Sequence, residues 1–400
     1  MIKRKYLGIF LLACSFCFAF NSFSQTENIF RKSKKEINVA MFLPLFYENI
    51  DELSFNQYNI AEKRSKSYKC FSYISFYEGA RIALNRLENE GYKVVLHVFD
   101  VEENNTDKTH KALQYEQMKN MDLLIALVFK NSFDLISSFA RENKIPLVNP
   151  MSPNMEILQN EYVFKIQPDD ISNAQTIMKY IQEKHPQANV IVLYENDKNK
   201  TSLINWYKDN IASYTSSWTI INYGKNANKL KTYLKPSSNN IFINLIEKSN
   251  NDDKVFANAL IKKLFGFSSY KITLFAPFEW LDYNNIDYSM MEKVDYHFTL
   301  TYLNDYSNPN FVDFVKEYRK HFKTEPDKFY AALGYDIMLY FIDAINIKGK
   351  TLQTGPNVKN NQKMINRYHF KHLGDYPGWQ NETTTIYNIR NYKIKSEWSY

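Results

Sequence analysis

The chain alternates between short apolar segments, typical of buried strands, and longer segments with helical spacing. One such unit, residues 76–100, reads FYEGARIALNRLENEGYKVVLHVFD. Tyr77, Ala80 and Leu84 recur at helical intervals, Gly91 is a typical helix stop, and a run of β-branched residues follows. Strands separated by helices of about 10–15 residues indicate a parallel sheet covered by helices on both faces.

The same alternation continues to the end of the chain and predicts an α/β fold. Residues 295–303, DYHFTLTYL, continue this alternation. After them we expect two helices, 309–323 and 327–347, and a last β-like run at 383–394. Earlier strands are predicted at 37–46, 92–100, 121–130 and 144–150, and then at 189–196, 218–224, 240–247 and 271–277, with 161–170 as a connecting strand.

At 400 residues the chain is long enough for two lobes of ordinary size. We predict two lobes, each a helix-covered, mostly parallel sheet, joined by a hinge of three crossovers. Lobe 1 is expected to contain 37–155 and 300–349, lobe 2 to contain 156–283 and 383–394, and 284–299 and 350–382 to be crossover or irregular segments.

The first two dozen residues are typical of an export signal. Three basic residues precede the apolar run LGIFLLACSFCFAF, and Ser22 and Ser24 are the small residues expected before a cut at Gln25. We therefore predict a signal peptide at 1–24 and a periplasmic protein. The alternative is a lipoprotein of the envelope, because Leu11-Leu12-Ala13-Cys14 is similar to a lipid-attachment motif at Cys14.

Charge and hydropathy argue against a nucleic-acid partner and against a membrane span in the mature chain. The formal net charge of +7 falls to about +4 once Lys3, Arg4 and Lys5 are removed with the signal. The rest of the chain holds no continuous basic stripe interleaved with aromatic residues, so no nucleic-acid partner is expected. No later stretch is long and apolar enough for a transmembrane span in the mature chain.

Several segments arrive in the order found in one family. These are FYEGARIALNRLENEGYKVVLHVFD, MDLLIALVFKNSFDLISSFARENKIPLVNPMS, NEYVFKIQPDD and FYAALGYDIMLYFIDAI. Together they resemble the type I periplasmic binding-protein fold of the leucine/isoleucine/valine-binding proteins, over about residues 37–394. The variant that they resemble most is a Bacteroidetes-type group often linked to LysM repeats, although no LysM repeat is recognisable in this chain.

The resemblance implies a Venus-flytrap protein that closes two lobes on a small polar solute such as an amino acid. Such proteins serve as the substrate-binding components of ABC transporters or as sensors, and they are neither enzymes nor cofactor proteins. Two departures concern the ligand. Members that bind amino acids commonly carry a Gly-Pro turn after the third strand and a Ser/Thr-rich loop after the fourth. Here these places read Phe129-Lys130-Asn131-Ser132 and Asn149-Pro150-Met151-Ser152-Pro153.

Candidate ligand residues follow from the rule that ligands bind beyond the carboxyl ends of parallel strands. Each polar candidate could equally be a solvated loop residue or a helix cap, and each aromatic candidate could pack at the edge of a core. The candidates are Phe46, Lys130, Asn131, Asn149 and Ser152 in lobe 1, and Glu195, Asn196, Glu247, Phe278 and Trp280 in lobe 2.

No pattern of catalytic residues is recognisable. The sequence has no G-x-S-x-G elbow and no phosphate-binding glycine loop. His369 and His372 have metal-ligand spacing, but they lack a third ligand and a helical context, so no metal or cofactor is expected. Two functions remain: a solute-binding protein, or an envelope interaction module with a degenerate cleft, of the kind that regulates cell-wall synthesis.

Overall fold

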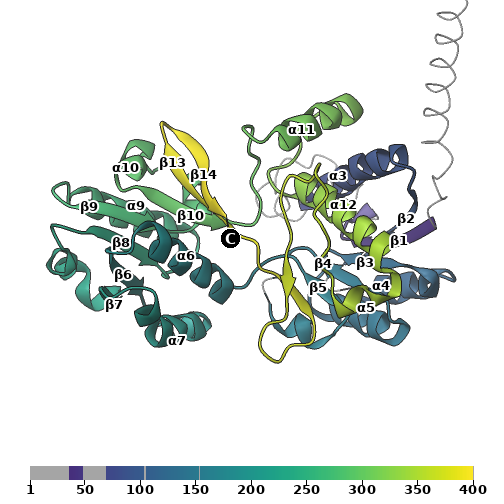
Figure 1. The fold of residues 1–400 in the computed structure, drawn as a ribbon, viewed down its shortest axis with the longest axis horizontal. Helices are drawn as coiled ribbons and strands as arrows, with labels where there is room; N and C mark the ends of the chain where they lie inside the picture. The colour runs from purple at the N-terminus through teal and green to yellow at the C-terminus, as the bar shows by residue number, and fades with distance from the viewer. Residues whose placement is uncertain (1–35, 48–68, 103–104, 153, 400) are drawn as a thin grey trace, which may run out of the picture.

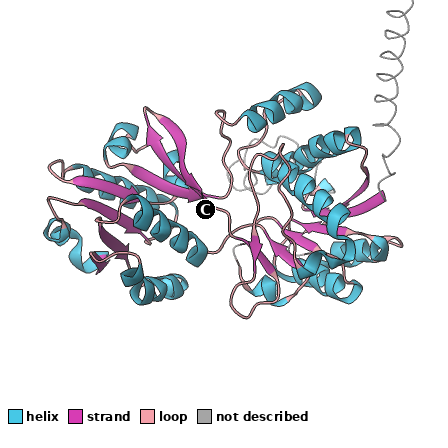
Figure 2. Cartoon of the chain, viewed as in Figure 1, coloured by secondary structure: helices cyan, strands magenta, loops and turns pink. Residues whose placement is uncertain are grey.

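The computed structural model describes residues 36–47, 69–102, 105–152 and 154–399, which form two lobes side by side (Figure 1). The predicted signal segment 1–24 and Cys14 lie outside the described residues. Each lobe is a sheet flanked by helices (Figure 2). Both sheets have seven strands, in the orders β11-β12-β5-β4-β3-β1-β2 and β14-β13-β10-β9-β8-β6-β7. The predicted α/β class and the two-lobed, mostly parallel architecture are confirmed.

Lobe 1 contains a parallel sheet with one antiparallel strand, β11, at its edge. Its strands are β1 (Glu36–Leu43), β2 (Lys93–Asp100), β3 (Leu123–Ala126), β4 (Leu147–Asn149), β5 (Val163–Lys165), β11 (Phe370–Lys371) and β12 (Trp379–Asn381). Its helices are α3 (Lys69–Asn89), α4 (Thr106–Leu113), α5 (Lys130–Asn143), α11 (Pro309–Phe322) and α12 (Tyr330–Lys348), with short 3-10 turns η2 (Met118–Asn120), η3 (Glu156–Gln159) and η8 (Gly349–Thr354).

Lobe 2 is parallel except for its C-terminal hairpin, β13–β14, which pairs antiparallel to β10. Its strands are β6 (Asn189–Tyr194), β7 (Trp218–Asn222), β8 (Asn239–Asn244), β9 (Lys271–Phe275), β10 (Tyr296–Leu300), β13 (Thr385–Arg390) and β14 (Lys393–Ser399). Its helices are α6 (Asp170–Lys184), α7 (Thr201–Asn210), α8 (Tyr223–Asn226), α9 (Asn250–Phe265) and α10 (Tyr288–Lys293), with 3-10 turns η4 (Lys198–Lys200), η5 (Ile211–Ser213), η6 (Ala227–Tyr233) and η7 (Phe278–Asp282).

Burial on both faces explains why β1 reads as a continuous apolar run. Val39 and Met41 pack into the core beneath α3 and α12, whereas Ala40 and Phe42 pack into the core beneath α4 and α5. Alternate residues of a strand point to opposite faces, so a strand that is buried on both faces is apolar at nearly every position.

Two glycines let α3 and α12 approach closely in the core of lobe 1. A Cβ added to Gly79 would lie 1.8 Å from the carbonyl oxygen of Ala331, and one added to Gly334 would lie 2.1 Å from the carbonyl oxygen of Phe76. Each glycine therefore faces the other helix's backbone, and no larger residue fits without moving the helices apart.

The chain crosses between the lobes three times: after β5, after β10 and after β12. The predicted boundaries are wrong in three places. Residues 163–165 were assigned to lobe 2, but β5 pairs with β4 in lobe 1. Residues 284–299 and 350–382 were expected to be crossover or irregular segments. They contain α10 and most of β10 in lobe 2, and β11 and β12 in lobe 1. These strands are very short or follow polar links, so hydrogen-bond pairing, rather than local pattern, assigns them to a sheet.

Candidate ligand cleft

The carboxyl ends of the central strands of lobe 2 open into a cavity of about 290 Å³ beside the hinge. Asn244 and Phe275 end β8 and β9 there, and Leu300 ends β10. This is the position where an open parallel sheet binds ligands. Its polar lining includes Gln167, Asp170, Lys200, Glu247, Glu279 and Thr299.

A bridging lysine organises the charges of this cavity. The Lys200 Nζ lies 2.8 Å from Asp170 Oδ2 and 2.6 Å from Glu247 Oε1, and the Lys200 side chain is only 13% exposed. Burial lowers the pKa of Lys200, but hydrogen bonds to the two carboxylates outweigh it and raise the pKa above its ordinary value. The cavity therefore presents a fixed ammonium between carboxylates, together with the further carboxylate of Glu279.

An aromatic wall closes one side of the cavity and reaches the other lobe. The ring centroids of Phe278 and Phe298 lie 5.2 Å apart, and Phe329 of lobe 1 meets Phe278 edge-on at 5.8 Å. Beside this pair, Lys328 Nζ of lobe 1 lies 2.8 Å from Asp282 Oδ1 of lobe 2. The lobes thus touch at a small aromatic contact flanked by an exposed ion pair, which contributes little to stability.

A chain of polar side chains ties the hinge crossovers together. The buried Lys165 donates to the carbonyl of Gln167 and, at 2.9 Å, to Gln380 Oε1. Gln380 Nε2 donates to Ser172 Oγ in α6 of lobe 2 at 2.9 Å. The Tyr302 hydroxyl, from the second crossover, donates to Gln167 Oε1 at 3.1 Å. Burial lowers the pKa of the Lys165 ammonium to about 8.

In lobe 1, three of the predicted residues line a different cavity. Lys130, Asn149 and Ser152 border a groove of about 660 Å³ between α5 and the segment after β4. Asn149 is buried, and its Oδ1 accepts hydrogen bonds from the Met151 and Ser152 N–H groups at 3.1 and 2.7 Å. Ser152 Oγ accepts from the Asn154 N–H at 3.2 Å. These oxygens therefore stabilise turns in their own loop.

The remaining lobe 1 candidates lie at the ends of neighbouring strands. Lys130 and Asn131 are exposed at the start of α5, and Lys130 has a left-handed φ of 53°, a conformation that favours glycine. Phe46 is half-buried against the core. The Asp100 carboxylate accepts the N–H groups of Leu45, Phe46 and Tyr47 at 2.8–3.1 Å, which anchors the loop after β1.

The structure brings together only two of the five lobe 2 candidates, Glu247 and Phe278. Glu195 is ion-paired with Lys248, and Asn196 is exposed and accepts from Asn222; neither lines the cavity beside the hinge. The prediction for Trp280 is corrected: it is fully buried in the lobe 2 core and donates to Asp253 Oδ2 at 3.0 Å. A strand-end aromatic that turns inward packs in the core instead of forming a wall.

Asp170 and Lys200 were missed from the sequence. Asp169 and Asp170 are adjacent acids at the start of α6, and Asp169 is the cap of this helix, since its Oδ1 accepts from the Ser172 N–H at 2.7 Å. A helix cap needs only one carboxylate, so capping leaves Asp170 unexplained. This second acid was the signal by which the sequence could have indicated a site. Lys200 follows a strand end by six residues and carried no such signal.

The two histidines with metal-ligand spacing have separate partners. His372 Nδ1 lies 3.0 Å from the Gly378 carbonyl oxygen, and its ring packs on Trp379. His369 Nε2 lies 3.6 Å from Glu382 Oε1. Within the described ranges, no three His, Cys, Asp or Glu side chains are grouped as metal ligands. In the same ranges, no helix combines the length and apolar character needed to cross a bilayer.

Two helix-covered sheets joined by three crossings, with a cavity beside the hinge, define the type I periplasmic binding-protein fold. The sequence matches the receptor family ligand binding region over residues 77–396, and the chain therefore belongs to this family. No curated protein matches the chain significantly.

Solved structures agree with this fold. An ABC transporter substrate-binding protein from Desulfitobacterium hafniense in complex with Leu is 15% identical, with 91% of this chain and 100% of that chain covered and a TM-score of 0.55. A putative branched-chain amino acid ABC transporter protein from Rhodospirillum rubrum is 11% identical, with the same coverage and a TM-score of 0.63. A solute-binding protein from R. palustris in complex with 4-hydroxybenzoate is 12% identical, with coverage of 92% and 97% and a TM-score of 0.56.

Proposed function

We propose that the protein is an exported, non-catalytic binding protein that closes its two lobes on a small polar solute, with amino acids as the first compounds to test. The observation that carries the proposal is the hinge-side cavity of lobe 2. It combines a fixed ammonium, carboxylates and an aromatic wall, and Phe278 in that wall already contacts lobe 1. Apolar walls with a few placed polar groups are typical of small-molecule sites.

The mechanism is a shift of population between open and closed states. A solute held by Lys200 and Phe278 gains contacts with lobe 1 only when the lobes approach, so it binds the closed state more tightly and favours it. Export by the predicted signal would place the protein in the periplasm, where it would serve transport or sensing. Lipid attachment at Cys14 is the alternative, and the mass of the mature N-terminus distinguishes the two.

A thermal-shift screen of the mature chain tests the proposal. The panel comprises amino acids, peptides, nucleosides and muropeptide fragments. A ligand at about a hundredfold its Kd stabilises the native state by about 2.7 kcal/mol. Small-angle scattering with each hit should show compaction. Phe278→Ala and Lys200→Met should abolish the shift, and Asn196→Ala, outside the cavity, should retain it. A full panel without a shift or compaction would refute the proposal.

A second candidate function is an envelope interaction module of the cell-wall-regulator type. It is favoured by one observation: the Asn149 and Ser152 oxygens, which were candidates for binding a ligand, accept hydrogen bonds within their own loop. Pull-down from envelope extract without added solute tests it. Specific recovery of a cell-wall synthesis enzyme by both wild type and Phe278→Ala would support it, and failure of the wild type to recover any such enzyme would contradict it.

A further inference from the structure

One side of lobe 2 carries lysines without acidic residues among them. Residues 210–246 contain four lysines and no Asp or Glu. We use the term basic face for Lys229, Lys231 and Lys235, on and just after η6, with Lys262 and Lys263 in the last turn of α9. The two segments are adjacent, because Lys263 Nζ donates to the Ala227 carbonyl at 3.0 Å.

The charge of the basic face is not neutralised locally. Lys229, Lys231, Lys235 and Lys262 are exposed, and no carboxylate in the described part of the chain forms an ion pair with any of the five lysines. Other exposed lysines do have such a partner, for example Lys316 in Asp313 and Lys328 in Asp282. Clustered charges of one sign create a surface potential that attracts anionic partners.

The basic face extends to the edge of the lobe 2 sheet. Lys235 Nζ donates at 2.8 Å to the Oγ of Ser217, the residue before the edge strand β7. Trp218, which begins β7 and is 39% exposed, pairs in register with Val190 and therefore faces the α6 and α7 side of the sheet, away from these lysines. The lysines themselves supply the attraction to anionic lipid.

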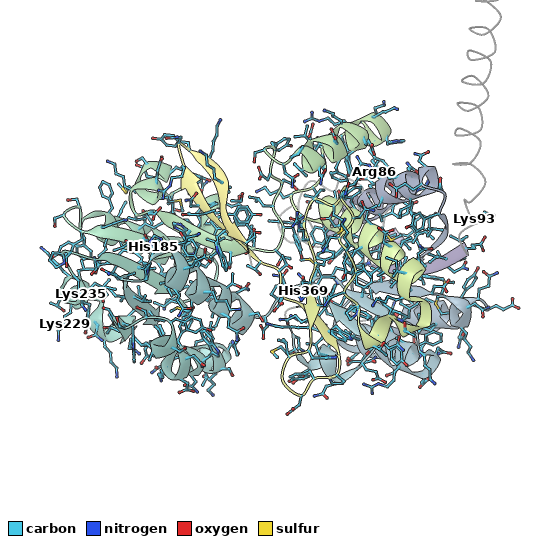
Figure 3. All side chains as sticks on the ribbon, in the orientation of Figure 1. Arg86, Lys93, His185, Lys229, Lys235 and His369 are labelled. Atoms are coloured by element: carbon cyan, nitrogen blue, oxygen red, sulfur yellow. The ribbon has the colours of Figure 1, made fainter. Side chains whose placement is uncertain are left out.

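We propose that the basic face docks the protein on anionic phospholipid headgroups. The three cavities described in this structure are lined by other residues, and an extended charged face suits a fluid headgroup layer. Lys229 and Lys235 lie at the end of lobe 2 remote from lobe 1 (Figure 3). Lys235 is also tied to the amino end of β8, since Asn240 Nδ2 donates to its carbonyl at 3.0 Å, whereas the ligand cavity lies at the carboxyl end. Docking therefore leaves the cleft accessible.

Co-sedimentation of the mature full chain with vesicles tests this proposal. The probes are vesicles of phosphatidylethanolamine with phosphatidylglycerol, vesicles of phosphatidylcholine alone, and soluble poly-glutamate. Each lysine near an anionic surface contributes about a five-fold factor in partitioning, so the triple variant Lys229→Gln, Lys231→Gln, Lys235→Gln should bind about a hundredfold more weakly. The matched control neutralises three exposed lysines of lobe 1 instead: Lys316, Lys320 and Lys323.

The proposal expects binding to the phosphatidylglycerol vesicles alone, release at about 0.5 M NaCl, loss in the triple variant and retention in the control. Circular dichroism of both variants checks that they are folded. Absence of vesicle binding by the wild type, equal binding to phosphatidylcholine, or equal loss in the control would overturn it. Binding of poly-glutamate without vesicle binding would also overturn it, and would assign the face to an acidic protein.

Discussion

Lys165 is the residue whose substitution most directly tests the physical account of the hinge. Its side chain is fully buried in β5 and donates to the Gln167 carbonyl and to Gln380 Oε1. Lys165→Met keeps most of the apolar stem and removes the ammonium. Two acceptors then lose a donor, which costs about 1–3 kcal/mol at every pH, whereas the cost of burying a charge disappears.

The magnitude follows from the pKa of Lys165, which burial lowers from 10.5 to about 8. Between these values the unfolded chain holds a proton that the folded chain has released, so the stability of the wild type rises with pH. The buried charge costs about 3.4 kcal/mol at neutral pH, and each pH unit above 8 removes about 1.36 kcal/mol of that cost. From pH 8 to pH 9.5 the wild type should gain about 2 kcal/mol relative to Lys165→Met.

Urea unfolding of wild type and Lys165→Met, followed by circular dichroism at pH 7, 8 and 9.5, measures this difference. Tyrosines titrate alike in both proteins and cancel when the two free energies of unfolding are subtracted. Lys198→Met, at an exposed lysine, is the control and should track the wild type at each pH. If the difference between wild type and Lys165→Met is constant across the three pH values, Lys165 is not a charge held at a cost and the reasoning fails.

Three further predictions concern stability. Gly334→Ala should destabilise lobe 1 by about 3 kcal/mol or more in urea unfolding, because its Cβ meets the α3 backbone, whereas Gly355→Ala, with no atom within 4 Å, should cost less than about 1 kcal/mol. The side-chain hydrogen bond from His297 at 2.7 Å is the largest cause that lowers the pKa of Glu397 to about 2. The stability from this pair is present above pH 4.5 and is lost as pH falls toward 2. After allowance for partial exposure, Glu397→Gln should remove about 1–2 kcal/mol of this loss. If the free energy of unfolding falls with acid equally in wild type and variant, the pair does not stabilise the fold. Trp280→Ala should lower stability by about 3–5 kcal/mol, measured by thermal unfolding. A variant that loses ligand binding but keeps full stability would show that Trp280 contributes to the cleft and not to the core.

The fold could be predicted because it depends on local pattern repeated along the chain. A strand such as β1, covered on both faces, must be apolar throughout, and a surface helix must show spacing near 3.6 residues. Both patterns can be recognised without knowing which strands and helices pack together. They fail for β11 and β12, which have two or three residues each, because such short segments carry no period. For β5, which lies within the predicted strand 161–170, they do not show which sheet it joins, because only its pairing with β4 decides that.

The candidate site could be predicted only in part. Phe278 and Glu247 follow strand ends and line the cavity, but Trp280, two residues beyond Phe278, turns into the core. Sequence indicates that a side chain is near a strand end; the turn that follows decides whether it faces inward or outward. Asp170 and Lys200 are thirty positions apart and meet only because α6 and α7 pack side by side on one face of the lobe 2 sheet.

The sequence by itself determined the class of fold, since the alternation of buried strands and amphipathic helices permits few other arrangements. Only the tertiary structure decided which crossings join the lobes, that a lysine is buried at the hinge, and which charges share the cavity. The physical reason is that burial of apolar surface depends on residue type and spacing along the chain, whereas hydrogen bonds and ion pairs depend on the positions of atoms that folding alone brings together.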